Sequence, residues 1–296
     1  MKKEIITVFM LMMGLTSCLR LDSQLFNSEV LSEYKFETYA GSRELGTLPA
    51  TYAVADSMRH LVTFTSNSSD GAAKLYGVYL GELNKIATDT VILYCHGNAK
   101  HMDNYWNRAK LLAHVGGKHR FGVLMFDYRG YGMSEGKSSE KNIYADADAA
   151  LKWLQSKGLT SSRLIVYGYS LGSAPSTEVA ANTYSLQPIK LLLEAPFASS
   201  EVMVQDASKL ALPGSYFTSA KINNADKIRN VKIPFMWMHG TADSFLSIHT
   251  HGEVVYKNYS GKKGEAHRIT GAEHGDLPMI WGYENYINAV YQFITK

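Results

Sequence analysis

Short apolar runs, separated by stretches with helical spacing, constrain the fold of this chain more than any other feature. Three of the runs, VILYC at 91–95, GVLMF at 122–126 and KLLLE at 190–194, are apolar almost throughout. Such runs are typical of strands covered on both faces. The alternation of strands and helices predicts an α/β fold with a mostly parallel sheet between two layers of helices. The expected strands lie near 60–65, 75–80, 91–95, 121–127, 164–168, 189–194, 233–238 and 266–269, and the expected helices span 101–114, 141–157, 171–183, 248–259 and 279–294.

The size and charge of the chain limit what it can be. Its 296 residues, 46% of them hydrophobic, suffice for one large α/β domain with a sizeable core. The net charge is +3, and no block of like charges stands out. We therefore expect no nucleic-acid partner, because basic tails and patches that bind nucleic acids are runs of like charge.

The N-terminus has the order of segments found in secretory signal peptides. A basic start at 1–3 precedes an apolar run at 5–15, which is too short to cross a bilayer as a helix. Leu15-Thr16-Ser17-Cys18 follows, and it resembles the bacterial lipobox, whose cysteine is lipidated. We expect residues 1–17 to be a lipoprotein signal peptide and Cys18 to anchor the protein to a membrane, outside the cytoplasm. The alternative is ordinary signal cleavage, with Cys18 incidental.

The rest of the chain is expected to form an N-terminal segment, 18–59, and a catalytic domain, 60–296. In the N-terminal segment five apolar residues recur at helix-like spacing and predict that 22–34 docks on the domain; they are Leu25, Phe26, Val30, Leu31 and Tyr34. Residues 197–226 are the expected small cap. The apolar residues there fit an acyl pocket and a cap sealed to the core equally well.

Two segments of the chain have the pattern G-x-S-x-G, centred on Ser134 and Ser170. A nucleophile elbow needs a strand that runs straight into the serine and a helix that leaves straight after it. Ser170 meets both conditions, and Gly168 and Gly172 leave room for the strained turn. A loop separates Ser134 from the strand before it, and no helical turn follows. The context therefore predicts Ser170 as the nucleophile.

A serine nucleophile needs a base and a group that orients the base, in the chain order Ser, Asp or Glu, His. Asp243 follows an expected strand at its carboxyl end, and His274 lies in a glycine-bounded loop after the last strand. Ligands of open α/β sheets bind at this edge. The rival acid is Glu194, at the end of the preceding strand, and the rival base is His267, within a strand.

Two backbone N–H groups are expected to bind the oxyanion. One is that of Leu171, directly after the nucleophile, and the other is that of Asn98, in the loop after the third strand. His249, His251 and Glu253 invite a metal interpretation, but helical residues two apart face different sides. We expect no metal and no cofactor.

Five segments, taken in order, resemble the α/β-hydrolase superfamily: YCHGNA, FDYRGYGMSEG, GYSLG, HGTAD and GAEHGD. The resemblance runs from about residue 60 to the C-terminus and is strongest to the minimal-cap branch with bud-emergence-type hydrolases and protein depalmitoylases. It implies an eight-stranded α/β-hydrolase fold in which Ser170, Asp243 and His274 act as nucleophile, orienting acid and base. Ser244 departs from the pattern, since an acidic residue is frequent there.

The residues and the resemblance together predict a serine hydrolase that cleaves carboxylic esters or thioesters through an acyl-enzyme. The expected substrate is a small-molecule or lipid-like ester. The same three residues would also serve an amidase or peptidase. From another class, a non-catalytic lipoprotein could keep the fold as a binding module.

Overall fold

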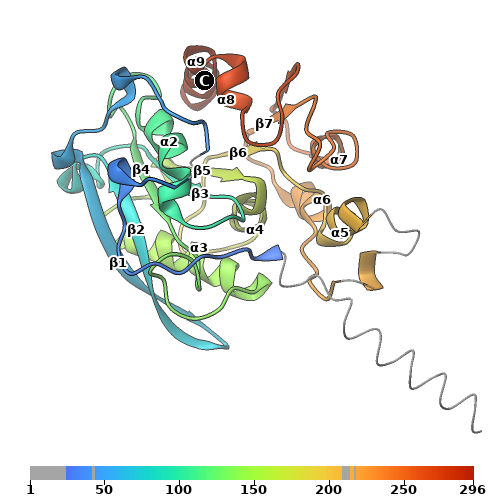
Figure 1. Cartoon of the computed structure of the whole chain (residues 1–296), viewed down its shortest axis with the longest axis horizontal. Helices are drawn as coiled ribbons and strands as arrows, with labels where there is room; N and C mark the ends of the chain where they lie inside the picture. The colour runs from blue at the N-terminus through green and yellow to red at the C-terminus, as the bar shows by residue number, and fades with distance from the viewer. Residues whose placement is uncertain (1–24, 42–43, 209–213, 217) are drawn as a thin grey trace, which may run out of the picture.

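The computed structural model describes residues 25–41, 44–208, 214–216 and 218–296 (Figure 1). The expected signal peptide and Cys18 lie outside these residues. Eight strands of the described chain form one sheet in the order β1-β2-β4-β3-β5-β6-β7-β8, and only β2 runs against the others. The strands are β1 (Arg59–Ser68), β2 (Gly71–Leu80), β3 (Val91–Cys95), β4 (Gly122–Phe126), β5 (Leu164–Tyr169), β6 (Lys190–Glu194), β7 (Phe235–Gly240) and β8 (Gly264–Ile269). The predicted α/β-hydrolase fold is confirmed.

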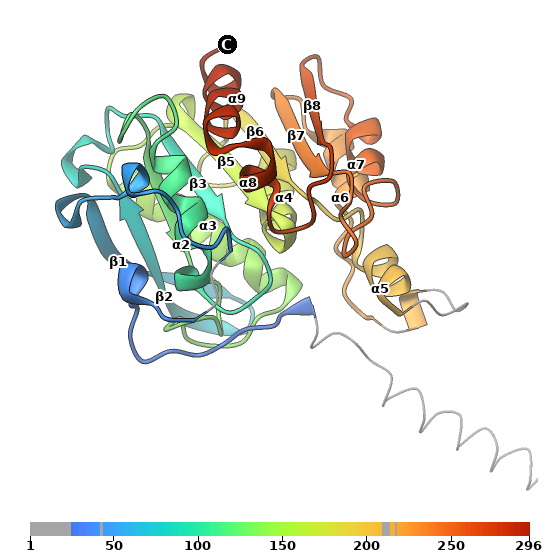
Figure 2. The same cartoon turned by 45° about the horizontal axis from the view of Figure 1, so that its top comes forward.

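Helices cover both faces of the sheet, as Figure 2 shows between its edges β1 and β8. On β3 the side chains of Ile92 and Tyr94 join the core under one helical layer, whereas Leu93 and Cys95 join the core under the other. One layer is α2 (Met102–Ala113) and α9 (Tyr283–Thr295), and the other is α3 (Glu140–Ser156), α4 (Ser173–Ala181), α6 (Asn224–Lys227) and α7 (Gly252–Asn258). Both faces of the strand are therefore buried, as its continuous apolar sequence predicted.

Two of the expected helices differ from the observed ones. The helix expected at 279–294 is two helices, α8 (Leu277–Trp281) and α9, because Gly282 between them has φ 88°. That conformation interrupts a right-handed helix and suits glycine. The helix expected at 248–259 begins later, at Gly252.

Residues 25–34 dock on the domain, as the spacing of their apolar residues predicted, and they do so through β-bridges. Ser28 pairs with Lys100 and Val30 pairs with Gly132 as parallel β-bridges. The N–H of Leu31 donates to the carbonyl of Gly132 at 2.8 Å. The loops after β3 and β4 thus supply the backbone partners that a helix would have found within itself.

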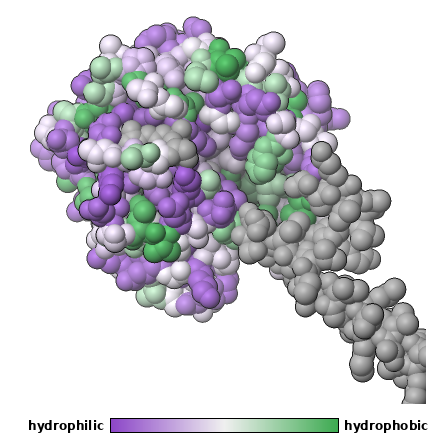
Figure 3. All heavy atoms as spheres, viewed as in Figure 1, coloured by the Kyte–Doolittle hydropathy of each residue, from purple (hydrophilic) through white to green (hydrophobic). Residues whose placement is uncertain are grey.

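In the expected cap, Ser200–Ser208 form α5, and Phe197 is buried in the core beneath it. Residues 209–213 and 217 of the cap lie outside the described chain. On the face of the molecule seen in Figure 3, polar and apolar side chains are interspersed, and the apolar ones occur in small groups. No described helix combines the length and the apolar character needed to span a bilayer.

Candidate active site

Ser170 stands on a sharp turn between β5 and α4. Its φ is 51°, which is a strained value for a serine, and it opens the short 3₁₀ turn Ser170–Gly172. A Cβ on Gly168 would lie 2.5 Å from the carbonyl oxygen of Gly172, and a Cβ on Gly172 would overlap the carbonyl of Cys95. Glycine is therefore required at both positions because the backbones approach too closely for any side chain.

Three polar side chains form a continuous hydrogen-bonded chain at the carboxyl edge of the sheet. The hydroxyl of Ser170 lies 2.9 Å from Nε2 of His274. Nδ1 of the same imidazole lies 2.8 Å from Oδ2 of Asp243. Asp243 follows β7 and His274 follows β8, so the parallel strands deliver all three groups to one edge although 104 positions separate serine from histidine.

Asp243 is held as a buried anion. Its Oδ1 accepts the N–H groups of Phe245 at 3.0 Å and Leu246 at 2.7 Å. Burial acts to raise the pKa of Asp243, but hydrogen bonds from His239 and His274 outweigh burial and hold the pKa below its ordinary value. An anionic acceptor requires a proton on Nδ1 of His274. Nε2 is then free to accept the proton of Ser170.

His239 is a site residue that the sequence reasoning missed. Its Nε2 lies 3.0 Å from Oδ2 of Asp243 and 2.9 Å from the carbonyl oxygen of Leu246. Both neighbours are acceptors, so Nε2 carries a proton and donates. The imidazole is fully buried and contacts the same oxygen of Asp243 as His274 does. The segment HGTAD contained the signal, since this histidine lies on the buried strand β7, four residues before the acid.

The hydroxyl of the rival serine is hydrogen-bonded to backbone groups. Ser134 is 5% exposed, accepts the N–H of Tyr76 at 3.0 Å and donates to the carbonyl of Asp127 at 2.8 Å. These two bonds tie the loop after β4 to β2. The hydroxyl contacts no imidazole.

The rival acid and base have partners of their own. Both carboxylate oxygens of Glu194 accept from Nη1 of Arg108, at 2.6 and 2.7 Å. His267 lies on β8, with Nε2 2.7 Å from Oε1 of Glu265. None of these bonds reaches Ser170 or His274.

The two residues expected to bind an oxyanion lie on two different segments of the chain. Leu171 is the second residue of the 3₁₀ turn, and the N–H groups that open a helical turn have no acceptor within it. Asn98 lies in the loop after β3, whose end packs against Gly172. The side-chain oxygen of Asn98 accepts the N–H of Asn27 at 2.7 Å and the hydroxyl of Tyr131 at 2.9 Å. The N-terminal segment thus braces this loop.

The mouth of the site has an aromatic edge. Phe245 is 55% exposed, and its ring centroid lies 5.0 Å from that of His274. Exposed aromatic surface beside a reactive imidazole suits an apolar part of a ligand. Tyr131 is fully buried in the core.

Two of the three residues considered for a metal, His251 and Glu253, bond to other groups. Nδ1 of His251 accepts the N–H of Ala198 at 3.1 Å, and Glu253 pairs with Arg268, whose Nη2 is 2.8 Å away. Within the described ranges, no three His, Cys, Asp or Glu side chains gather as metal ligands would.

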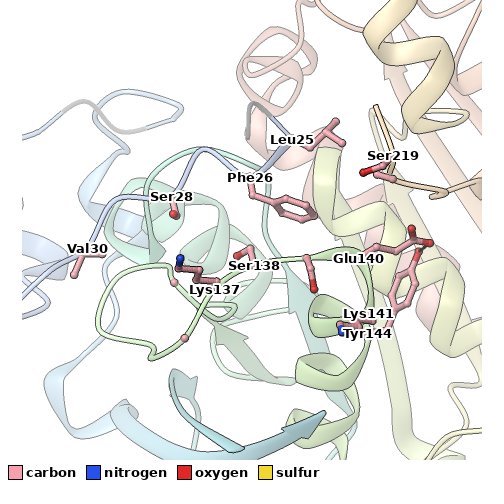
Figure 4. A pocket seen from close by; sticks show the side chains of 14 residues that line it. Leu25, Phe26, Ser28, Val30, Lys137, Ser138, Glu140, Lys141, Tyr144 and Ser219 are labelled. Carbon is pink, nitrogen blue, oxygen red and sulfur yellow. Dashed lines mark hydrogen bonds between the residues drawn. The ribbon is translucent and has the colours of Figure 1, made fainter. Parts of the chain in front are cut away.

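A separate hollow of about 810 Å³ lies beside the N-terminal segment. Figure 4 shows Phe26 reaching from that segment over the start of α3, toward Ser138 and Glu140. Ser170, Asp243 and His274 are not among the residues that line it. The hollow is therefore separate from these three residues.

Comparison with known proteins agrees with the topology. The family model described as "alpha/beta hydrolase fold" matches residues 90–192. Alpha/beta hydrolase domain-containing protein 17B of Xenopus tropicalis is 31% identical over 207 residues, which are 69% of this chain and 66% of that protein. Alpha/beta hydrolase domain-containing protein 17C of Homo sapiens is 31% identical over 206 residues, which are 69% of this chain and 57% of that protein. The chain matches less than two thirds of either relative's length.

Solved structures extend the similarity over most of the chain. An esterase from Pyrococcus furiosus superposes with a TM-score of 0.66 at 18% identity, covering 92% of this chain and 97% of that one. Esterase RhEst1 from Rhodococcus sp. superposes with a TM-score of 0.58 at 19% identity, covering 80% of this chain and 98% of that one. At these identities the likeness concerns the fold. The chain belongs to the α/β-hydrolase superfamily, and the similarities support a hydrolase enzyme.

Proposed function

We propose that this protein is a serine hydrolase that cleaves carboxylic esters or thioesters through an acyl-enzyme, with Ser170, Asp243 and His274 as its catalytic triad. The observation that carries the proposal is the unbroken hydrogen-bonded chain from Ser170 through His274 to Asp243, at 2.9 and 2.8 Å. A binding module has no need of a strained serine, an oriented imidazole and a buried anion in one line.

Each of these groups has a role in the proposed reaction. Oγ of Ser170 bonds to the substrate carbonyl carbon while its proton passes to Nε2 of His274. The resulting oxyanion is bound by the N–H groups of Leu171 and Asn98. The leaving alcohol or thiol takes the proton from Nε2 as its bond to the carbon breaks. Water then attacks the acyl-enzyme, gives one proton to Nε2, and the carboxylic acid leaves as Ser170 recovers its proton.

The substrate class rests on the same site and its rim. The exposed ring of Phe245 offers apolar contact next to His274, which suits a small-molecule or lipid-like acyl group. The solved structures that superpose on this chain include esterases, which supports ester cleavage in particular.

A fluorophosphonate probe tests the proposal directly. The wild-type protein should be labelled on Ser170, and a matched panel of ester, thioester and peptide substrates should show turnover of the first two. Absence of labelling and turnover would refute the hydrolase. Turnover of peptides alone would make it a peptidase with the same triad.

We further propose that residues 1–17 are removed as a lipoprotein signal peptide, that 18–59 precede the domain 60–296, and that lipid on Cys18 anchors the enzyme outside the cytoplasm. Two or more acyl chains would give a stable attachment, because each buried CH₂ contributes about 0.8 kcal/mol. The order of basic, apolar and lipobox-like segments supports this location.

Fractionation of cells tests the anchor. Cys18→Ala should release the protein from membranes or stall its processing, and the solubilised enzyme should keep its activity. Mass spectrometry of the N-terminal peptide should find a lipid on Cys18. An unmodified Cys18, or a Cys18→Ala protein that stays wholly in the membrane fraction, would contradict the anchor.

A further inference from the structure

Two side chains hold the backbone of the loop that carries His274. The hydroxyl of Tyr169 donates to the carbonyl of His274 at 3.1 Å. Nη2 of Arg108 donates to the carbonyl of Gly275, the next residue, at 3.2 Å. Consecutive carbonyls of the loop are therefore fixed by groups from β5 and α2, two elements far from the loop in sequence.

The guanidinium of Arg108 is held by two carboxylates and an aromatic ring. Its side chain is fully buried. Nη1 donates to both oxygens of Glu194, and Nη2 lies 3.2 Å from Oε2 of Glu44 in the N-terminal segment. The guanidinium carbon sits 4.0 Å from the ring centroid of Tyr169, in cation–π geometry. One rigid fork thus joins α2, β6, the N-terminal segment and the His274 loop.

We propose that Arg108 is a positioning residue that sets the place of His274 relative to Ser170, with Glu194 and Glu44 as its counter-ions and Tyr169 as a second support. The proposal rests on the proposed function, since it assigns a task within that reaction. Tyr169 immediately precedes Ser170, so the contact links the nucleophile's strand to the loop of the base.

A purely structural role explains these contacts less well. Replacing a whole buried ion pair with apolar residues of similar volume is often neutral or stabilising, so stability alone is a weak reason to bury one. The guanidinium offers five donors in a fixed plane, and here they reach two carboxylates and a loop carbonyl at once. A lysine has one nitrogen and cannot span these partners.

A second buried arginine provides a matched control. Arg129 is 2% exposed, and its Nε donates to Asp146 at 2.9 Å. Its other bonds go to the hydroxyls of Ser66 and Ser68 and to the carbonyl of Gly71, around the β1–β2 hairpin. Arg129 is nearly as buried as Arg108 and is also paired with a carboxylate, yet none of these bonds reaches the loop of Ser170 or that of His274.

The experiment compares Arg108→Lys, the double variant Arg108→Met/Glu194→Met and the control Arg129→Lys in the full-length protein. A misplaced base costs about 10²-fold in kcat. We expect that loss in Arg108→Lys and in the double variant, with KM changed less than about twofold because the substrate-contacting surface is intact. The control should lose stability but keep its kcat per folded molecule. The double variant should remain folded, because it removes Arg108 and its buried partner Glu194 together, and Glu44, which loses one partner, is 18% exposed and keeps access to water.

Restored kcat in the double variant, or an equal loss of kcat in Arg129→Lys, would overturn the proposal and leave Arg108 a structural residue. The low-field proton resonance of Nδ1 in His274 gives a readout without turnover. It should shift in Arg108→Lys and stay in place in Arg129→Lys. If the wild-type protein neither turns over esters nor reacts with fluorophosphonate, the proposed function fails, and this resonance alone decides whether Arg108 positions His274.

Discussion

The segments GMSEG (132–136) and GYSLG (168–172) share one pattern but need their glycines for opposite reasons. Gly132 and Gly136 have φ of 54° and 84°, values that favour glycine, and the serine between them is not strained. In the other segment the serine takes the positive φ, and the glycines are required by close backbone approach. The pattern therefore shows where glycine is needed. Only the reason for the glycine, a positive φ or a close backbone approach, distinguishes a loop from a nucleophile elbow.

A histidine and an aspartate lie near both serines. Nε2 of His96 is 3.0 Å from Oδ1 of Asp127, whose carbonyl accepts the hydroxyl of Ser134. In that cluster the serine bonds to the backbone of the acid, and the imidazole is stacked on Tyr105. Around Ser170 the imidazole stands between serine and acid. The order of contacts, not the set of residues, separates a catalytic cluster from a structural one.

The largest expected effect tests the two serines directly. Ser170→Ala should lower kcat by about 10⁶-fold, because triad members act as a unit. Ser134→Ala should keep most of the kcat and lose about 1–3 kcal/mol of stability, because it leaves buried backbone partners unsatisfied. Ester turnover and urea unfolding measure the two quantities. Equal losses of kcat, or fluorophosphonate labelling that survives in Ser170→Ala, would reverse the assignment.

The acid gives the next effect in size. Asp243→Asn should lower kcat by about 10⁴-fold, since an amide favours the wrong tautomer of His274. Glu194→Gln should cost far less, because Glu194 pairs with Arg108 and does not contact His274. Steady-state kinetics of both variants measure the two losses of kcat. If Glu194→Gln were the crippling change, the triad acid would follow β6 instead of β7.

The two kinds of glycine predict different losses of stability. Gly136→Ala meets no atom closer than 3.5 Å, so its cost is the strain of a positive φ, about 1–2 kcal/mol. Gly172→Ala would overlap the carbonyl of Cys95 and should cost more than about 3 kcal/mol, as forced overpacking of a core can. Denaturant unfolding compares them. A milder effect at Gly172 would mean that the turn can widen.

The smallest expected effect is a pH dependence. Because the pKa of Asp243 is lowered in the folded protein, its anion stabilises the fold above the unfolded value of about 3.9, and this stability is lost as pH falls further. The gap in Tm between wild type and Asp243→Asn should therefore shrink from pH 5 to pH 3. The gap for Ser134→Ala, which removes no titrating group, should stay constant. A gap for Asp243→Asn that widened toward pH 3 would contradict the lowered pKa.

Local sequence rules succeeded where one element decides its own structure. Continuous apolar runs such as 91–95 and 190–194 located buried strands, and the strand–turn–helix context separated Ser170 from Ser134. For residues 25–34 the spacing of apolar residues predicted docking on the domain but not the way in which the segment docks. Their backbone partners come from the loops at Lys100 and Gly132, which the spacing of side chains cannot reveal.

The sequence by itself determined the class of fold and the strand–turn–helix context of Ser170, because each apolar run and the turn depend on residues within a few positions of one another. Only the tertiary structure decided which acid faces His274 and that His239 also bonds to Asp243. It also decided that Arg108 pairs with Glu194 and donates to the carbonyl of Gly275. Those contacts join residues brought together at the carboxyl ends of separate parallel strands. Side chains on such ends meet through the order of strands in the sheet, a property that no local pattern encodes.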